Sequence, residues 1–145
     1  MTDLEPVVSV GDTFDRVVSL DEASIVAFAS AAGDANPLHH DREVAARSRF
    51  GGIIASGPQT SSLLLGLCAT WFTARGESVG LDFSFRFCKA VRAGETLRLT
   101  WTITEIVAKP SLKGELVSIA GRVVDSSGTV VLESQGVVLL FSAQS

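Results

Sequence analysis

An aspartate and a histidine stand five positions apart in the segment Gly33-Asp34-Ala35-Asn36-Pro37-Leu38-His39. A histidine titrates at about pH 6.5 and an aspartate at about pH 4, so a pocket that raises the pKa of the aspartate lets the two exchange a proton near neutrality. Gly33 favours the left-handed conformation that ends a helix, and Pro37 keeps the helix from resuming nearby. The segment therefore predicts an acid/base pair, Asp34 and His39, on one loop.

Each of these residues also has an ordinary structural explanation. Aspartate and asparagine side chains bond their own backbone two residues on, which favours turns. A metal cluster at His39-His40-Asp41 has no further ligand at a supporting spacing, so we expect no metal site. The combination of Asp34 with His39 on one loop, more than either residue alone, favours catalysis.

Helices are predicted on both sides of this loop. The first begins after Asp21, its expected N-cap, and ends at Gly33. Its apolar residues recur at the helical period, at Ile25, Val26, Phe28, Ala29 and Ala32. The second is short and covers residues 41–48, and a strand over residues 14–19 precedes both.

A longer helix is expected over residues 57–75, with Ser56 as its N-cap. Apolar residues occupy nearly every side of it, which predicts burial on all sides. The apolar run is shorter than the ~20 residues that a bilayer needs, and the first turn is polar, so we expect no membrane span.

The rest of the chain predicts a meander of strands that buries this helix. Alternating apolar and polar residues mark strands over residues 81–88 and 97–104, and two more are expected over 115–125 and 129–142. The last two are joined by Ser126-Ser127-Gly128, a composition suited to a tight turn. Such a sheet leaves edge strands open, and pairing with a second copy would close them.

The amino-acid composition of the chain also favours a homo-oligomer. Charged residues make up 19% of the chain, against a usual share of about 25%, while 46% are hydrophobic. A monomer would have little charge to cover its surface, so we expect a homodimer or a higher homo-oligomer. The length of 145 residues fits one domain over residues 1–145.

The net charge of -4 argues against a nucleic-acid partner, because such proteins usually carry a basic stripe. The nearest cationic cluster is Arg86, Lys89 and Arg92, which could meet a phosphorylated ligand, although a solvated strand edge is the preferred interpretation. The acidic segment at residues 1–6 lacks the features of a secretory signal, so a cytoplasmic protein is expected. Cys68 and Cys88 match no metal spacing and are both predicted in or near the core.

The stretch Phe28-Ala29-Ser30-Ala31-Ala32-Gly33-Asp34-Ala35-Asn36-Pro37-Leu38-His39-His40-Asp41 resembles the signature of MaoC-like dehydratases and (R)-specific enoyl-CoA hydratases. The likeness continues through Ala45, Phe50, Gly52, Ile54-Ala55-Ser56-Gly57, Phe85-Arg86-Phe87 and Val91-Arg92-Ala93-Gly94-Glu95-Thr96-Leu97. It implies an α+β hot-dog fold, in which an antiparallel sheet wraps around one long buried helix and an additional loop and helix segment carries the active-site motif. The working unit of that family is usually a dimer.

The resemblance also implies a reaction. Asp34 and His39 would be the catalytic pair of a hydro-lyase that adds water to the C2=C3 bond of a (2E)-enoyl thioester, of coenzyme A or of acyl carrier protein. The product would be the (R)-3-hydroxyacyl thioester, and the enzyme could also run in reverse as a dehydratase. Such a reaction needs no cofactor, but it needs a donor that stabilises the thioester oxygen while it carries enolate charge.

Gly57 is the first candidate for this donor, because the first N–H groups of a helix have no partner within the helix. Asn36 is expected to fix the loop or to reach the substrate. Ser62 lies where the family often has a serine that helps to hold the site, although Ser61 is adjacent and the register stays open. Ser56 is expected to shape the substrate pocket: Ser56-Gly57-Pro58 stands where the family commonly has His-Gly-Met, and Lys89-Ala90 stands where Lys-Pro is usual.

Two rival functions are considered. A hot-dog thioesterase commonly uses a carboxylate on or beside the buried helix, but this chain has no Asp or Glu between Glu43 and Glu77. A carboxylate from elsewhere or from a second subunit stays open. The other rival is a non-catalytic acyl-thioester-binding subunit, or half of a heterodimeric dehydratase. The presence of both Asp34 and His39 argues against an inactive subunit.

Overall fold

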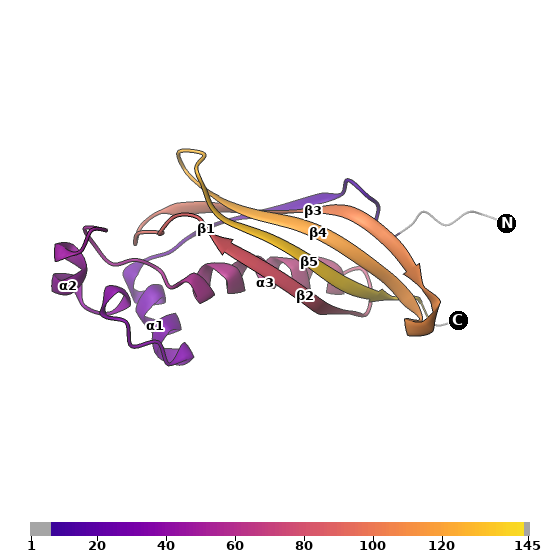
Figure 1. The fold of residues 1–145 in the computed structure, drawn as a ribbon, viewed down its shortest axis with the longest axis horizontal. Helices are drawn as coiled ribbons and strands as arrows, with labels where there is room; N and C mark the ends of the chain where they lie inside the picture. Colours follow the sequence, from indigo (N-terminus) through magenta and orange to yellow (C-terminus); the bar gives the residue numbers. More distant parts are fainter. Residues whose placement is uncertain (1–6, 144–145) are drawn as a thin grey trace.

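A strongly curved five-stranded antiparallel sheet arches over one long helix in the computed structural model, which describes residues 7–143 (Figure 1). The strand order is β1-β3-β4-β5-β2. The elements are β1 (Thr13–Ser19), α1 (Glu22–Ala32), α2 (Arg42–Arg47), α3 (Gly57–Thr73), β2 (Ser78–Phe87), β3 (Thr96–Lys109), β4 (Gly114–Asp125) and β5 (Val130–Phe141). The acidic segment at residues 1–6 lies outside the described residues.

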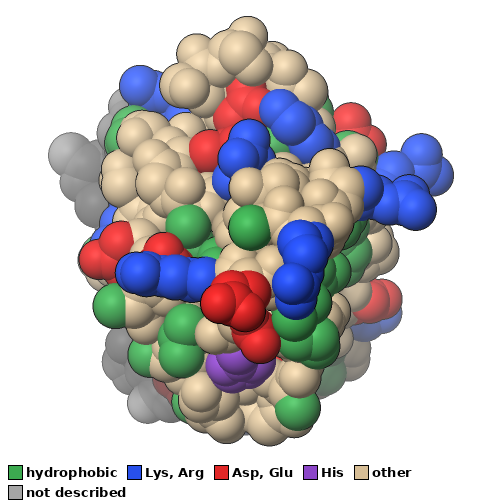
Figure 2. All heavy atoms as spheres, turned by 90° about the vertical axis from the view of Figure 1, so that its left-hand side faces the viewer, with side chains coloured by type: hydrophobic (Ala, Val, Ile, Leu, Met, Phe, Trp, Pro, Cys, Tyr) green, Lys and Arg blue, Asp and Glu red, His purple; other side chains and the backbone are tan. Residues whose placement is uncertain are grey.

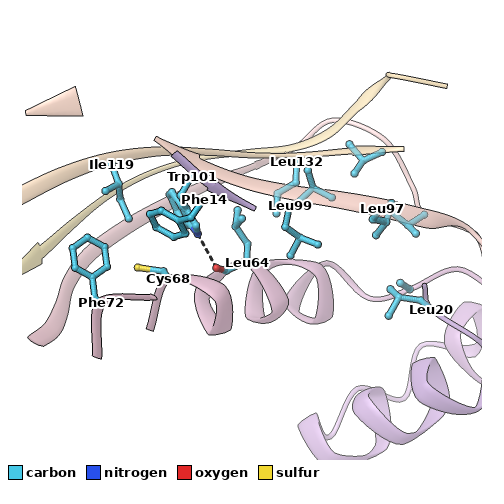
Figure 3. Close-up of a cluster of buried hydrophobic side chains, with 14 of the residues drawn as sticks. Phe14, Leu20, Leu64, Cys68, Phe72, Leu97, Leu99, Trp101, Ile119 and Leu132 are labelled. Carbon is cyan, nitrogen blue, oxygen red and sulfur yellow. Dashed lines mark hydrogen bonds between the residues drawn. The ribbon is translucent and has the colours of Figure 1, made fainter. Parts of the chain in front are cut away.

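Helix α3 packs one face against the sheet. Leu64, Cys68 and Phe72, four residues apart, are buried and point toward the strands (Figure 3). Burial raises the pKa of the Cys68 thiol to about 12, so it packs as a neutral apolar group. Trp101 of β3 donates from Nε1 to the carbonyl oxygen of Leu64 at 2.8 Å, which satisfies its one polar atom in the core.

The opposite face of α3 is open, which corrects the expectation that the helix is buried on all sides. Ser62, Gly66 and Ala69 are exposed, and Leu63 and Trp71 are only partly buried. The reason is that the sheet covers one side of the helix and α1 meets only its first turns. No helix among the described residues is long and apolar enough to cross a membrane.

Cys88 is exposed, so the expectation that it lies in or near the core is wrong. It directly follows Phe87, the last residue of β2, and β2 is an edge strand. Its side chain leaves the sheet, with Sγ 3.6 Å from the carbonyl oxygen of Arg86.

The turn between β4 and β5 is organised around one buried carboxylate, that of Asp125. It accepts hydrogen bonds from the backbone N–H groups of Ser127 and Thr129, each at 3.0 Å, and from the Ser127 hydroxyl at 2.6 Å. Its other oxygen binds Nζ of Lys89 at 2.7 Å. The Lys89 ammonium and these donors hold the pKa of Asp125 well below its usual range, and the bond to Asp125 raises the pKa of Lys89. Asp125 thereby ties the segment after β2 to the hairpin.

The hydrogen bonds of the Asp125 carboxylate predict that the stability of the fold depends on pH. The pKa of Asp125 is lower in the folded chain than its value of about 3.9 in the unfolded chain. The stabilisation is therefore fully present above about pH 4 to 5 and is lost as the pH falls toward the folded pKa. We expect Asp125→Asn to unfold at lower urea concentration than the wild type at about pH 7, with the difference shrinking at about pH 3.

Asp15→Asn is the matched control for this measurement. Asp15 pairs with Arg98 on the exposed edge of the sheet, and an exposed pair contributes little to stability. A urea midpoint of Asp125→Asn that matches the wild type at neutral pH, or a difference that does not change with pH, would contradict the role of the buried carboxylate.

Candidate functional site

Asp34 is placed by the end of α1. Gly33 adopts the left-handed conformation, with φ of 74°, and the N–H of Asp34 donates back to the carbonyl oxygen of Ala29 at 2.8 Å. One carboxylate oxygen, Oδ1, then accepts the N–H of Asn36 at 3.0 Å. The prediction that Asp34 bonds its own backbone in a turn is thus confirmed. This bond uses only one of the two carboxylate oxygens.

His39 lies in the short 3-10 helix that follows, Pro37–His39, and its side chain is buried. Its Nδ1 is 2.7 Å from the carbonyl oxygen of Ile54. A carbonyl can only accept, so Nδ1 carries the proton and neutral His39 presents a free lone pair on Nε2. This Nε2 lies 3.5 Å from Oδ2 of Asp34, the oxygen that the turn leaves free. The two predicted residues therefore meet through a basic nitrogen and an acceptor oxygen.

Hydrogen bonds hold the backbone on both sides of the Ile54 carbonyl. The N–H of Ile54 donates to the carbonyl oxygen of Leu38 at 3.2 Å. The N–H of Ala55 donates to the carbonyl oxygen of Val91 at 2.8 Å, and the N–H of Ala93 donates to that of Ile53 at 2.9 Å. This short antiparallel ladder of residues 53–55 with 91–93 joins the His39 loop to the chain after β2. The orientation of the imidazole therefore depends on backbone pairing.

Helix α3 begins beside His39. The buried Ser56 caps it by accepting the N–H of Gln59 at 3.3 Å, and Gly57 is the first helical residue. The ring of Phe87 lies against Gly57 so closely that a Cβ there would be 2.9 Å from Cε1 of Phe87. A side chain at this position would have to displace the ring of Phe87.

His39 and Gly57 line the same open hollow, of about 530 Å³, together with Phe50, Thr60, Phe87 and Lys89. Asp34 lines a second hollow, of about 540 Å³, on the other side of the loop, with Ser30, Pro37 and His40. The pair thus bridges two recesses at the end of the molecule formed by α1 and α2. Figure 2 views this end, where a histidine lies against acidic side chains.

The other predicted residues take structural positions. Asn36 accepts the N–H of Leu38 and caps the 3-10 helix, so it fixes the loop. Ser56 is 2% exposed and acts as the helix cap, so it does not face the hollow. Ser62 is exposed and lies outside both linings, while the Ser61 hydroxyl donates to the carbonyl oxygen of Pro58.

Sequence reasoning missed several lining residues. Thr60 lies one helical turn after Gly57, so the helical period could have identified it. Phe50 and Phe87 belong to the stretches that resemble the family, but the residue types of Phe50, Phe87 and Cys88 do not indicate that they line the hollow. These three residues reach it only through the pairing of distant segments. Pairing of this kind cannot be derived from spacing.

Residues 7–124 match the family model for the MaoC like domain. A UPF0336 protein of Streptomyces avermitilis is 33% identical over 114 residues, which are 72% of this chain and 73% of that protein. An (R)-specific enoyl-CoA hydratase of Rhodospirillum rubrum is 26% identical over 129 residues, which are 87% of this chain and 89% of the relative.

The fold is shared with solved hydratases. The structure of an (R)-hydratase from A. caviae superposes with a TM-score of 0.82 at 26% identity, covering 92% of this chain and 97% of that one. The family match spans most of the chain, and the structural match confirms the expected hot-dog architecture. The chain belongs to the MaoC-like dehydratase family, as its sequence motif implies.

Proposed function

We propose that this protein is a hydro-lyase that adds water across the C2=C3 bond of a (2E)-enoyl thioester to give the (R)-3-hydroxyacyl thioester, or removes it in reverse. The observation that supports this most directly is the pairing of His39 Nε2 with Asp34 Oδ2 at 3.5 Å, beside the start of α3. The family relationship and the hydratases among the relatives support the reaction class.

The chemistry follows from the protonation state. A water held between Nε2 of His39 and Oδ2 of Asp34 gives a proton to Nε2 as its oxygen bonds to C3. The π electrons of C2=C3 move toward the thioester, whose oxygen gains enolate charge. The proton then returns from the pair to C2, so that water is added with all atoms balanced. Each positioned acid or base contributes about 10²–10⁴ in rate.

Gly57 supplies the donor for the enolate oxygen in this proposal. It is the first residue of a 17-residue helix, so its N–H points out along the positive end of the helix dipole. It lines the same hollow as His39, which brings donor and base to one substrate. A donor of this kind contributes about 10²–10³ to turnover.

We also propose a homodimer that covers the open face of the chain. The edge strand β2 exposes Val79, Leu81 and Phe87, with about half of each side chain accessible. Its outer backbone edge is unpaired within the sheet, and the open side of α3 lies next to it. A second copy pairing along β2 would bury these apolar groups.

The first prediction of this proposal tests the acid/base pair. We expect Asp34→Asn and His39→Gln to lower kcat for hydration of crotonyl-CoA by at least ~10², because each removes a proton acceptor. Loss of the ultraviolet absorbance of the conjugated thioester reports hydration, and a thiol reagent reports any hydrolysis. Asp15→Asn, on the distant edge of the sheet, is the matched carboxylate control.

The outcomes of that assay separate the candidate functions. Loss of absorbance without thiol release supports the hydro-lyase, whereas thiol release would indicate a thioesterase. Near-normal turnover of Asp34→Asn would remove Asp34 from the mechanism. Wild-type protein that does neither reaction would point to a binding subunit.

A second prediction concerns the donor. In Gly57→Ala the new methyl displaces the ring of Phe87, which is 56% exposed and free to move, so the fold should persist while the N–H is crowded. We expect kcat/KM for crotonyl-CoA to fall ~10²-fold. Gly66→Ala, on the same helix with open space around it, should keep normal kinetics. Equal kinetics for the two variants would contradict an approach of the thioester oxygen to the Gly57 N–H that is close enough for a methyl group to crowd.

A third prediction concerns assembly. Sedimentation at micromolar concentration should give twice the chain mass for the wild type, and Leu81→Lys should shift the protein toward the monomer. The physical reason is that a charge at this half-exposed site would be buried without a partner in the dimer. Wild-type protein that sediments as a monomer would rule out the proposed interface.

A further inference from the structure

His40 is the histidine of the His39-His40-Asp41 motif to which the proposed function gives no role. Its side chain is half-buried and lines the second hollow together with Asp34. Its Nε2 is 2.6 Å from the backbone carbonyl oxygen of Asp34, six positions earlier in the chain. Since a carbonyl can only accept, Nε2 of His40 carries the proton. Neutral His40 is therefore the opposite tautomer from neutral His39, whose proton is on Nδ1.

The backbone on both sides of His40 fixes the place from which its ring projects. The N–H groups of His40 and Asp41 both donate to the carbonyl oxygen of Pro37, at 3.1 and 2.8 Å. Asp41 then caps α2 by accepting the N–H groups of Glu43 and Val44. The imidazole therefore reaches from the junction of the 3-10 helix and α2 back to the end of α1.

The bond from His40 completes the set of bonds that hold Asp34. The N–H of Asp34 donates to the carbonyl oxygen of Ala29, and Oδ1 accepts the N–H of Asn36. The carbonyl oxygen of Asp34 accepts Nε2–H of His40, which restricts rotation of the peptide plane between Asp34 and the next residue. This plane leads to the N–H of Asn36 that orients the carboxylate. The oxygen outside this set is Oδ2, which lies 3.5 Å from Nε2 of His39.

We propose that His40 is a positioning residue for the acid/base pair, whose Nε2–H holds the backbone of Asp34 so that Oδ2 faces Nε2 of His39. The inference rests on the proposed function, in which Asp34 and His39 hold the reacting water. His40 lines the second hollow, whereas Gly57 lines the hollow of His39 on the other side of the loop. Loss of the His40 bond therefore disturbs the pair and leaves the surface that meets the thioester unchanged.

The kinetic test uses two variants of His40. His40→Leu removes the donor, and we expect kcat for crotonyl-CoA to fall about tenfold to 10²-fold with KM unchanged, because a misplacement of about 1 Å has effects of this size. His40→Gln offers an amide N–H near the place of Nε2 and should restore most of kcat. Thr73→Val is the matched control, because it removes a 2.7 Å bond from a hydroxyl to the carbonyl oxygen of Ala69 at the far end of α3. It should keep normal kinetics.

A double-mutant cycle tests whether His40 acts through Asp34. In the Asp34→Asn background the carboxylate that His40 positions is gone, so adding His40→Leu should lower kcat little further. An equal loss of kcat in both backgrounds would show that His40 acts independently of Asp34 and would overturn the inference. Normal kcat in His40→Leu, or an effect confined to KM, would overturn it as well.

The hydrogen bond itself is tested without any substrate. The chain has two histidines, so a long-range proton–nitrogen NMR spectrum of the full chain contains two imidazole systems. At about pH 8.5, where an ordinary imidazole is neutral, we expect His39 as the Nδ1–H tautomer and His40 as the Nε2–H tautomer. The loss of one system in His40→Gln assigns them.

The spectrum of the wild type decides the inference even where His40→Leu does not fold. A His40 that carries its proton on Nδ1, or that exchanges between the two tautomers, would overturn it. Wild-type protein that shows the expected tautomers but hydrates no crotonyl-CoA would refute the proposed function instead.

Discussion

The hydrogen bond from Nδ1 of His39 to the carbonyl oxygen of Ile54 is the interaction on which the site depends. It places the proton on Nδ1, which leaves Nε2 basic and directed at Asp34. The bond is buried, so breaking it would leave a polar group without a partner in a region of low dielectric. The backbone ladder with residues 91–93 holds the carbonyl, so this bond, together with that from the Ile54 N–H to Leu38, connects the loop after α1 to the chain after β2.

Helix α3 connects the core of the fold to the site. Its apolar face packs under the sheet at Leu64, Cys68 and Phe72, which fixes the axis of the helix (Figure 3). Its first residue, Gly57, then lies at a set place beside His39 without any side chain of its own to hold it there. A donor from the backbone needs no reorientation when charge develops, because the whole helix is pre-organised by its packing. The packing that stabilises the core therefore also fixes the position of the proposed donor, Gly57.

Local features of the fold could be predicted from the sequence because neighbouring residues determine them. Asp21 caps α1, Gly33 ends it, Ser56 caps α3, and the turn at residues 126–128 joins β4 to β5. The start of β2 and the end of β3 were not predicted. Register shifts between Gly80 and Asp82 and between Ile103 and Glu105 interrupt the alternation of apolar residues, so the pattern begins after the start of β2 and stops before the end of β3.

Within the site, the contact of Asp34 with His39 could be predicted because the two residues are close in sequence. The partner of His39 could not, because Ile54 contributes a backbone carbonyl, which has no residue-type signature. The bond from Lys89, a residue of the hollow, to Asp125 could not be predicted either, because it spans 36 positions. The exposure of Cys88 was missed for the related reason that strand alternation does not reveal which strand lies at an edge. The periodicity of apolar residues does not show which distant segments of the chain lie next to each other.

The structural and catalytic explanations of Asp34, which look like alternatives in the sequence, apply to different atoms. Its Oδ1 makes the turn bond to Asn36, and this bond orients the carboxylate so that Oδ2 faces His39. Asn36 in turn caps the 3-10 helix that delivers His39. An aspartate without the turn would leave its carboxylate free to rotate, and a turn residue with a single acceptor atom would have none left for the imidazole. The turn chemistry of this loop is therefore what makes the proposed proton transfer geometrically possible.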